Sequence, residues 1–578
     1  MNYSDRPTRN LLSTIAVAVA LWISSSTGAP GQEANAIYTG GDIITINDLQ
    51  PTAEAVAVKD GKILAVGTKA DVLKHNGTAT KMVHLGGKTL LPGFIDAHGH
   101  VFNTGLQALA AKLLAEPDGT VNDMVALQQT LRDWAKQHPE RLAKTGWIIG
   151  FGYDDAQLKE QRHPTRDDLD AISTTTPVLA IHQSGHLGAI NSKGLGIAGI
   201  TATSKDPAGG VYRRREGSSE PDGVLEEMAF FKVVFTVLGT LGADDNKALL
   251  KAGLDLYASF GFTTAQEGRA TPEAIETEAS VAREGGLKMD VVAYADIQGA
   301  AHTIKPPLHA KTYTQHFRIG GAKLNLDGSP QGKTAWLTKP YLVPPAGQEA
   351  DYRGYPAVSD DEAIALVDEA FGNGWQILAH CNGDAASDQF IAAIRAATEK
   401  YGKADRRPVM IHAQTVREDQ LDEMKELGII PSFFGMHTYY WGDWHRDSVL
   451  GPERAARISP AASALKRGMI HTQHHDAPVA LPSAIMILAS QVNRTTRSGR
   501  VLGAEQRVSV MAALKTITIA AAYQYFEENT KGSLEPGKLA DFVILDKNPL
   551  KVESVSIKDI KVVETIKEGD VIYRAPGR

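Results

Sequence analysis

The chain has 578 residues, of which 43% are hydrophobic and 22% charged, and its formal net charge is −7. This composition supplies a large apolar core, excludes a disordered, collagenous or polytopic membrane protein, and disfavours nucleic-acid binding. The single cysteine, Cys381, excludes an internal disulfide framework and a cysteine-rich zinc module. Any transition metal must therefore be held mainly by His and carboxylate side chains.

The first residues have the three-part pattern of a secretory signal peptide. Arg6 and Arg9 precede an uncharged apolar run over residues 11–23, and small and polar residues follow it, with an Ala-Asn-Ala site at 34–36. A membrane anchor is the alternative, but a spanning helix needs about 20 apolar residues. We expect removal of residues 1–36 and export without a stable membrane anchor, to the periplasm if the source is Gram-negative and otherwise as a secreted protein.

Two β-rich stretches lie at the ends of the remaining chain. Residues 37–92 contain short apolar runs around a Lys-Asp-Gly-Lys turn, and residues 533–578 contain similar runs around a Glu-Gly-Asp turn. Neither stretch offers enough strands for a stable core of its own. We predict one small β-sandwich domain built from both chain ends; two unrelated β-extensions are the alternative.

The middle of the chain, residues 93–532, alternates short apolar runs with polar loops and helical patterns such as 365–374 and 417–428. The candidate strands are 89–98, 262–268, 289–296, 319–328, 375–380, 408–413, 428–434 and 468–476. Eight βα units predict an α/β fold, a TIM (β/α)8 barrel with its active site at the C-terminal ends of the strands. An open doubly wound sheet is the alternative, but no G-x-G-x-x-G motif opens the first unit.

The gap between the first two candidate strands is too long for a loop. It contains a helical pattern, VNDMVALQQTLRDWAKQHPERLA, and the β-rich runs WIIGFGYD and PVLAIHQSG. We therefore predict a large lobe inserted into the barrel at about residues 103–257.

Metal-ligating residue types stand at the predicted strand ends. His98 and His100 follow the first strand, and two residues apart on an extended chain their side chains point to one face. His380, His412 and Asp476 end three later strands. A buried histidine at a strand end is often a hydrogen-bonded core residue, but five such residues at ends that converge on one rim favour a metal site.

Lys323 lies in the apolar strand GGAKLNLDG. A lysine at this position is costly to bury without a partner. Its structural role would be a salt bridge, for instance with Asp327. Its functional role would be that of a metal ligand after reaction with carbon dioxide, because an ammonium group cannot coordinate a cation.

These motifs together resemble the amidohydrolase superfamily, through LLPGFIDAHGH, the strand lysine, the two strand-end histidines and the aspartate of HHDAPV. The runs GWIIGFGYDD, PTRDDLDAIS, KLNLDGSPQGKTAWL, LAHCNGDAASDQ and GSLEPGKLADFVILD resemble its amidohydrolase-3 branch, which contains YtcJ-like proteins and N-substituted formamide deformylases. The resemblance covers nearly everything after the signal peptide and is less specific for substrate than for family.

The resemblance implies one or two divalent metal ions, most readily zinc. His98 and His100 would bind the more buried ion together with Asp476, and His380 and His412 would bind the second. Lys323, as a carbamate formed with carbon dioxide, would bridge the two ions.

In the reaction that the resemblance implies, a metal-activated water attacks the carbonyl carbon. Asp476 would act as the general base and then pass the proton to the leaving nitrogen. Some members of the branch work with one metal, which leaves the Lys323 bridge open.

The resemblance also points to substrate contacts. His186, in the predicted lobe, matches a family histidine that contacts substrate; packing within the lobe is its alternative role. The loop at 437–451 follows the seventh strand and brings His437, Tyr440 and Trp441 toward the predicted pocket, where aromatic side chains would grip an apolar or planar substrate or shield the site from water. Cys381 has no evident base and is interpreted as a buried thiol.

The motifs and the resemblance leave three functions open. The first is hydrolysis of a C–N bond in a small-molecule amide or N-formyl or N-acyl compound. The second is a deaminase or cyclic-amide hydrolase, although the Glu expected shortly after the strand-end histidine is absent from His380-Cys381-Asn382-Gly383. The third is a non-catalytic protein similar to exoenzyme regulators, which the intact ligand set disfavours. A homodimer is an open option for assembly.

Overall fold

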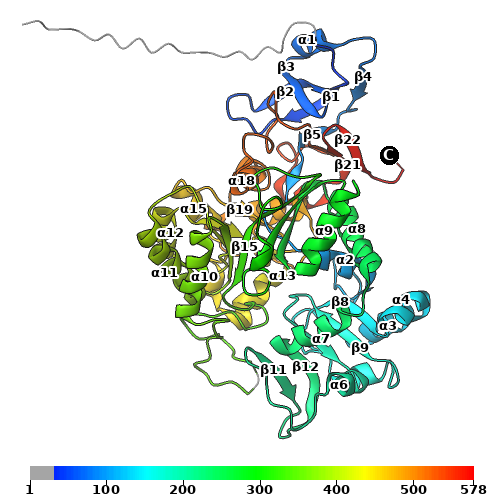
Figure 1. Ribbon diagram of the computed structural model, residues 1–578, viewed down its shortest axis with the longest axis vertical. Coiled ribbons are helices and arrows are strands. Elements are labelled where there is room, and N and C mark those ends of the chain that lie inside the picture. Colours follow the sequence, from blue (N-terminus) through cyan, green and yellow to red (C-terminus); the bar gives the residue numbers. More distant parts are fainter. Residues whose placement is uncertain (1–31, 346, 578) are drawn as a thin grey trace, which may run out of the picture.

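The computed structural model describes residues 32–345 and 347–577, so the predicted signal segment through residue 31 lies outside the described residues. Figure 1 shows an elongated molecule. A sheet built from both chain ends lies at one end, an α/β unit lies in the centre, and a second, smaller sheet with its helices lies at the other end. No helix in the described ranges is long and apolar enough to span a bilayer.

Residues from both chain ends form one eight-stranded sheet. Its strands are β1 (Ala36–Ile44), β2 (Thr52–Lys59), β3 (Lys62–Gly67), β4 (Lys81–His84), β5 (Thr89–Pro92), β20 (Phe542–Leu545), β21 (Val562–Lys567) and β22 (Asp570–Arg574). The two ends meet where β5 pairs antiparallel with β20, and the buried side chains of Leu90 and Phe542 belong to a common apolar cluster. We call this unit the terminal sheet.

The terminal sheet already includes the predicted signal-cleavage site. The backbone N–H of Ala34 donates to the carbonyl of His75, that of Asn35 donates to Val58, and Ala36 begins β1. Ala34 is also buried. Cleavage after Ala36 would remove these contacts.

The central sheet has eight parallel strands in chain order, the order of a (β/α)8 barrel. They are β6 (Phe94–Ile95), β13 (Phe262–Ala270), β14 (Asp290–Asp296), β15 (Phe317–Asn325), β16 (Gln376–Cys381), β17 (Val409–His412), β18 (Ile430–Phe433) and β19 (Thr472–Gln473). Each predicted segment contributes one strand to the central sheet. The first segment, however, is divided between two sheets, because Thr89–Pro92 pairs within the terminal sheet and only Phe94–Ile95 joins the central one.

The sheet is curled, and the segments after its first and last strands hydrogen-bond to each other. The backbone N–H of Asp476 donates to the carbonyl of His98 at 3.2 Å, and that of His100 donates to the carbonyl of Ala477 at 2.8 Å. These bonds bring the two ends of the strand order together at the rim that carries the predicted ligands.

Amphipathic helices cover the central sheet (Figure 1). The pattern predicted at 365–374 lies in α10 (Asp360–Gly372), and the one at 417–428 forms α12 (Glu418–Leu427), which ends where Gly428 adopts a left-handed φ of 70°. In α11 (Asp384–Tyr401), Ala386, Phe390 and Ile394 recur every four residues and form a buried stripe.

A separate six-stranded sheet occupies the stretch between α2 (Val101–Leu109) and α8 (Ala243–Ser259). Its strands are β7 (Ala111–Lys112), β8 (Ile148–Tyr153), β9 (Val178–His182), β10 (Leu187–Ile190), β11 (Gly210–Arg214) and β12 (Pro221–Glu227). Apolar clusters of its own lie on this sheet, for example around Leu127 and Val178. We call it the lobe; its β9–β10 turn carries Ser184 and His186.

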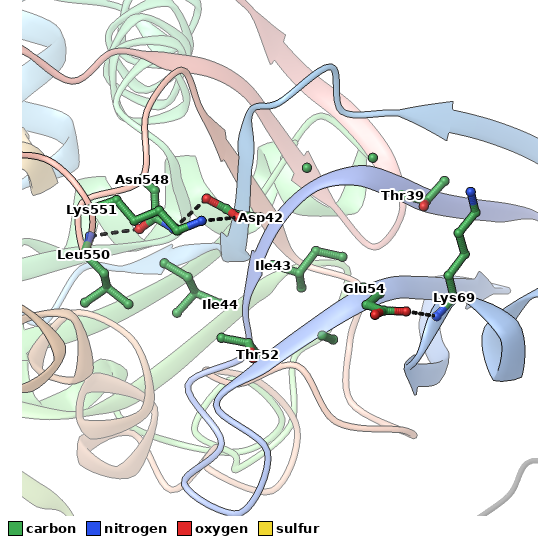
Figure 2. A pocket seen from close by; sticks show the side chains of 13 residues that line it. Thr39, Asp42, Ile43, Ile44, Thr52, Glu54, Lys69, Asn548, Leu550 and Lys551 are labelled. Atoms are coloured by element: carbon green, nitrogen blue, oxygen red, sulfur yellow. Dashed lines mark hydrogen bonds and ion pairs between the residues drawn. The ribbon is translucent and has the colours of Figure 1, made fainter.

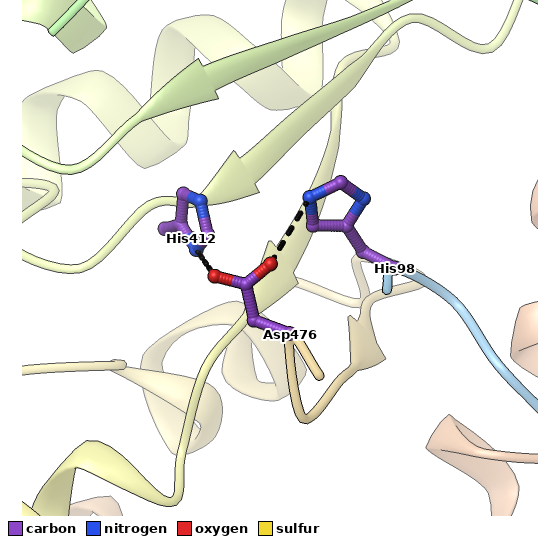
Figure 3. A group of neighbouring side chains, drawn as sticks. All are labelled: His98, His412 and Asp476. Atoms are coloured by element: carbon purple, nitrogen blue, oxygen red, sulfur yellow. Dashed lines mark ion pairs between the residues drawn. The ribbon is translucent and has the colours of Figure 1, made fainter. Parts of the chain in front are cut away.

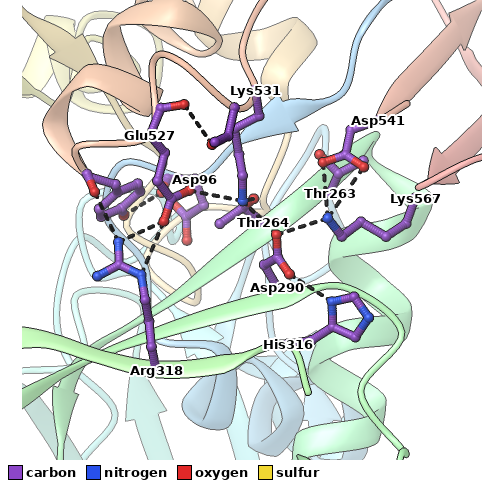
Figure 4. Close-up of polar contacts among 12 residues, drawn as sticks. Asp96, Thr263, Thr264, Asp290, His316, Arg318, Glu527, Lys531, Asp541 and Lys567 are labelled. Atoms are coloured by element: carbon purple, nitrogen blue, oxygen red, sulfur yellow. Dashed lines mark hydrogen bonds and ion pairs between the residues drawn. The ribbon is translucent and has the colours of Figure 1, made fainter. Parts of the chain in front are cut away.

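A network of buried charges connects the terminal sheet to the central sheet (Figure 4). Asp290, which begins β14, accepts from Lys531 at 2.5 Å and from Lys567 at 2.8 Å, and Lys567 also lies 3.0 Å from Asp541. Glu527 pairs with Lys531 and with Arg318. Because these side chains are nearly inaccessible to solvent, each needs its partner to offset the loss of hydration.

We predict that Asp290→Asn destabilises the protein by about 3–5 kcal/mol, because it leaves two buried lysines with too little negative charge. The measurement is the free energy of unfolding in urea. The matched control is Asp71→Asn, which breaks an exposed pair with Lys74 and should leave the free energy of unfolding nearly unchanged. Equal effects of the two substitutions would contradict the role of the network.

Candidate metal centre

The six predicted ligands meet at the C-terminal ends of the central strands. His98 and His100 follow β6, Lys323 and His380 lie in β15 and β16, and His412 ends β17. Asp476 lies three residues after the end of β19, at the start of a turn. All are buried except His100, whose side chain is 18% exposed.

Asp476 is the point on which the imidazoles converge. Its Oδ1 lies 3.4 Å from Nε2 of His98 and 3.4 Å from Nε2 of His100, and its Oδ2 lies 4.0 Å from Nδ1 of His412. Figure 3 shows the carboxylate between His98 and His412. Two ligands of one tetrahedral zinc ion are about 3.3–3.4 Å apart when each bond is about 2.0–2.1 Å long. The two distances from Oδ1 of Asp476 match this value, whereas the distance to His412 is longer; one ligand atom each of His98, His412 and Asp476 lie within 4.8 Å of one another.

The remaining predicted ligands adjoin this group. Nζ of Lys323 lies 2.9 Å from Nε2 of His98, and Nε2 of His412 lies 2.9 Å from Nδ1 of His380. The six side chains thus form one connected cluster.

Neighbouring acceptors orient two of the histidines. Nδ1 of His98 lies 2.5 Å from Oε1 of Gln266, whose own amide nitrogen donates to the carbonyl of Ala97 and to the hydroxyl of Tyr525. Nε2 of His380 lies 3.1 Å from the carbonyl of Gly328. A metal-bound histidine typically donates its other ring N–H to such an acceptor, so these contacts direct Nε2 of His98 and Nδ1 of His380 into the cluster, where they contact Lys323 and His412.

Several buried polar atoms of the cluster have no hydrogen-bond partner among the described residues: Nδ1 of His100, Nδ1 of His412, Oδ1 of Asp476 and both ring nitrogens of His474. His412 and Asp476 also have left-handed backbone conformations, with φ of 73° and 53°. Unpaired buried atoms and backbone strain are both costly and are typical of functional sites. The residues present fit a divalent metal ion.

The protonation states suit metal binding. Burial and the neighbouring charges, Lys323 among them, hold the pKa values of His98, His380 and His412 well below the usual range, so these rings are neutral near pH 7. Burial lowers the pKa of Lys323 to about 7. His100 differs, because the carboxylates of Asp476 and Glu267, 3.4 and 3.7 Å away, raise its pKa to about 8 although burial opposes this; this ring must therefore lose a proton when it binds an ion.

The family model of the amidohydrolase family matches residues 81–573. The chain belongs to the amidohydrolase family. It is 25% identical to the putative amidohydrolase YtcJ of Bacillus subtilis, over 93% of this chain and 99% of that protein. It is also 25% identical to the N-substituted formamide deformylase of Arthrobacter pascens, over 93% of this chain and 98% of that protein. The solved structure of an uncharacterized metal-dependent hydrolase from Pyrococcus horikoshii shares the fold, with a TM-score of 0.71 at 24% identity, over 90% of this chain and 99% of that chain.

A small pocket lies at the rim that the C-terminal ends of the central strands form. Its lining comprises Ser184, His186, Ser329, Gln331, His380, Asn382, His412, Phe434, His437, Asp476 and Val479. Three of the predicted ligands and two of the predicted substrate contacts, His186 and His437, are among these residues. Nδ1 of His186 lies 2.8 Å from Glu227, which raises the pKa of this ring despite its burial, and the ring centroid of His186 is 5.4 Å from that of His380.

Tyr440 and Trp441 do not line this pocket. The hydroxyl of Tyr440 donates to Asp118, and the indole N–H of Trp441 donates to Asp154, so both side chains attach α13 (His437–Trp444) to the lobe. Trp441 packs against His437 at a centroid distance of 4.6 Å and thereby supports one pocket residue. Their polar atoms make buried contacts with the lobe instead of facing the pocket.

The structure also identifies residues that the sequence pattern did not single out. Gln266 and Glu267 end the apolar run of β13. Adjacent polar residues within a buried strand are the feature of the sequence that could have identified them as site residues. Asp327 is not a salt-bridge partner of Lys323: it accepts the backbone N–H groups of Trp336, Asn382 and Gly383. Burial raises the pKa of Asp327 to about 7. The thiol of Cys381 is buried, which raises its pKa well above the usual range.

A larger hollow of about 670 Å³ lies on the terminal sheet (Figure 2). Its acidic side chains already have partners: Asp42 accepts from Lys551 and from Asn548, and Glu54 accepts the backbone N–H of Lys69. The hollow contains none of the clustered ligands, so it is not the candidate active site.

We predict that Gln266→Leu weakens metal binding about 10- to 100-fold, because the Nδ1–H of His98 loses the acceptor that orients the ring. The measurement is metal affinity by chelator competition. The matched control is Gln389→Leu. It removes a buried glutamine of α11 that also makes two hydrogen bonds but contacts none of the proposed ligands. Equal metal affinities of the two variants would contradict an orienting role for Gln266.

Proposed function

We propose that the protein is a metal-dependent hydrolase with a (β/α)8 barrel that cleaves a C–N bond in a small amide or an N-formyl or N-acyl compound. The observation that carries the proposal is the spacing of 3.4 Å from Oδ1 of Asp476 to both His98 and His100, together with unpaired buried donor atoms around it. The two full-length relatives, one named an amidohydrolase and the other a deformylase of N-substituted formamides, support this bond class.

His98, His100 and Asp476 would hold one divalent ion, most readily zinc, and His380 and His412 a second. When bound, such an ion lowers the pKa of a coordinated water and polarises the carbonyl of the substrate. Neutral imidazoles are required for this role, and burial already keeps the pKa values of His98, His380 and His412 low.

Lys323 would bridge two ions as a carbamate. Its pKa of about 7 leaves a substantial fraction of neutral amine near pH 7, and only the neutral amine can attack carbon dioxide. The nitrogen forms a bond to the carbon of carbon dioxide and releases one proton, which yields an anionic carboxylate-like group. This change replaces a buried cation with an anion among the imidazoles.

Asp476 would move the proton. Its carboxylate lines the pocket and lies within 4.0 Å of three imidazoles, so it can accept a proton from the attacking water at one oxygen and return it to the leaving nitrogen. His186, held by Glu227, would donate a hydrogen bond from Nε2 to an oxygen of the substrate.

We also propose that the protein is exported. The apolar run over residues 11–23 after two arginines supports export, and the ordered contacts of Ala34 and Asn35 favour a cleavage position before residue 34.

We predict that Asp476→Asn lowers kcat by at least about 100-fold on any amide that the wild type hydrolyses, because an amide side chain cannot accept the proton. Metal content, measured by elemental analysis, should remain at one ion or more per chain. The control is Asp443→Asn, a partly exposed position in α13, which should keep full activity. Full activity of Asp476→Asn with bound metal would contradict the assignment of the base.

We predict that the zinc-supplemented wild type binds two ions per chain and that Lys323→Ala binds one, because the bridging anion is lost. Short carboxylic acids such as acetate should restore part of the lost activity by occupying the vacated position. Lys288→Ala, which breaks a pair near the protein surface, is the control and should keep both ions. A wild type that binds no ion after supplementation would contradict the proposed function itself.

A further inference from the structure

Three buried side chains in the pocket have oxygen atoms without a partner among the described residues. They are Ser329 (Oγ), Gln331 (Oε1) and Asn382 (Oδ1), with exposed fractions of 4%, 5% and 3%. None of them is a proposed metal ligand. A buried polar atom without a partner costs about 1–3 kcal/mol, so three of them in one pocket indicate that a polar ligand completes their hydrogen bonds.

The orientation of Asn382 is fixed by its neighbours. Its amide nitrogen donates to the carbonyl of Gly328 at 3.0 Å, and a carbonyl can only accept, so Oδ1 is the free atom. The backbone N–H of Asn382 donates to Asp327 at 2.9 Å, and its carbonyl accepts from Thr415. Asn382 therefore presents a hydrogen-bond acceptor that cannot turn into a donor without the loss of an existing bond.

The loop that carries Ser329 and Gln331 is held in place as well. The backbone N–H of Ser329 donates to Oγ1 of Thr334 at 2.9 Å, and the carbonyl of Gln331 accepts the indole N–H of Trp444 at 3.0 Å. Because these backbone groups are fixed, both side chains remain at the pocket.

The acceptors lie beside the reacting groups. Asn382 follows the proposed ligand His380 by two residues, and its amide nitrogen lies 3.1 Å from that ring. Asp476 lines the same pocket. Asn382, Ser329, Gln331 and Asp476 therefore line one pocket, the one in which the substrate would bind.

We propose that Asn382, supported by Ser329 and Gln331, binds the N–H of the scissile amide and selects substrates that keep at least one hydrogen on that nitrogen. This inference rests on the proposed function. A fully substituted nitrogen would leave Oδ1 of Asn382 buried and unpaired, and sites that bind a substrate N–H discriminate strongly against analogues that lack it.

The experiment compares matched pairs, such as an N-alkylformamide or acetanilide and its N-methyl derivative, on the zinc-loaded full-length protein. We expect the wild-type kcat/KM to favour the N–H member by at least about 100-fold. Asn382→Leu, of similar size but without an acceptor, should lower this preference about tenfold or more, whereas Asn382→Asp, which keeps the acceptor, should retain it. Gln331→Met should lower it by a smaller factor.

The two members of a pair are compared on the same variant, so a general loss of stability or metal lowers both kcat/KM values and leaves their ratio unchanged. Asn373→Leu, at the end of α10, is the control and should keep the wild-type preference. A wild-type ratio near one, or an unchanged preference in Asn382→Leu, would overturn the inference, because the second result would mean that the methyl group is rejected by its size. If neither member of any pair is hydrolysed, the proposed function fails. Calorimetric binding of the two members would then still decide the inference, since equal affinities would overturn it.

Discussion

The arrangement of the candidate site depends on one carboxylate, that of Asp476, which is buried among three imidazoles without enough hydrogen-bond donors to satisfy it. This constraint follows from parallel strands whose C-terminal ends meet at one rim. The backbone bonds between Asp476 and His98 and between His100 and Ala477 hold the first and last strands of the order together at this point. Such a cluster of unpaired atoms is unfavourable unless a cation completes it, and this links the stability of the rim to metal binding.

Buried ionisable groups are paired at one end of the central strands and kept uncharged at the other. At the end that faces the terminal sheet, Asp290 is bound by Lys531 and Lys567, and the buried charges there offset one another. At the rim, burial shifts the pKa of Lys323 toward neutrality and keeps the histidines uncharged. The first arrangement attaches the terminal sheet to the barrel, while the second leaves donor atoms available for chemistry. The lobe adds polar contacts from outside the barrel, with His186 held by Glu227 beside His380.

Much of this could be predicted from local patterns. The eight apolar segments contribute one strand each, and the six proposed ligands are connected through contacts of 4.0 Å or less. Residues without a periodic or motif signal were missed. Gln266 orients His98 from a neighbouring strand, and Asp327 binds three backbone N–H groups instead of pairing with Lys323. Tyr440 and Trp441 lie in the predicted loop, but acidic residues of the lobe bind their polar atoms. Gln266, Tyr440 and Trp441 each depend on a partner more than 80 residues away, and Asp327 depends on which of several donors reaches its carboxylate; local spacing encodes neither.

The sequence by itself determined the class of the protein: apolar runs at βα spacing, histidines and an aspartate at strand ends, and one cysteine that excludes a cysteine-rich zinc module. These features are local, since strand periodicity and residue type follow from neighbours in the chain. Only the tertiary structure decided which ring nitrogens face the carboxylate, which side chains orient them, and which oxygens of the pocket remain unpaired. Those properties depend on distances between segments far apart in the chain, such as the 225 residues between Lys323 and His98, and packing in three dimensions alone sets them.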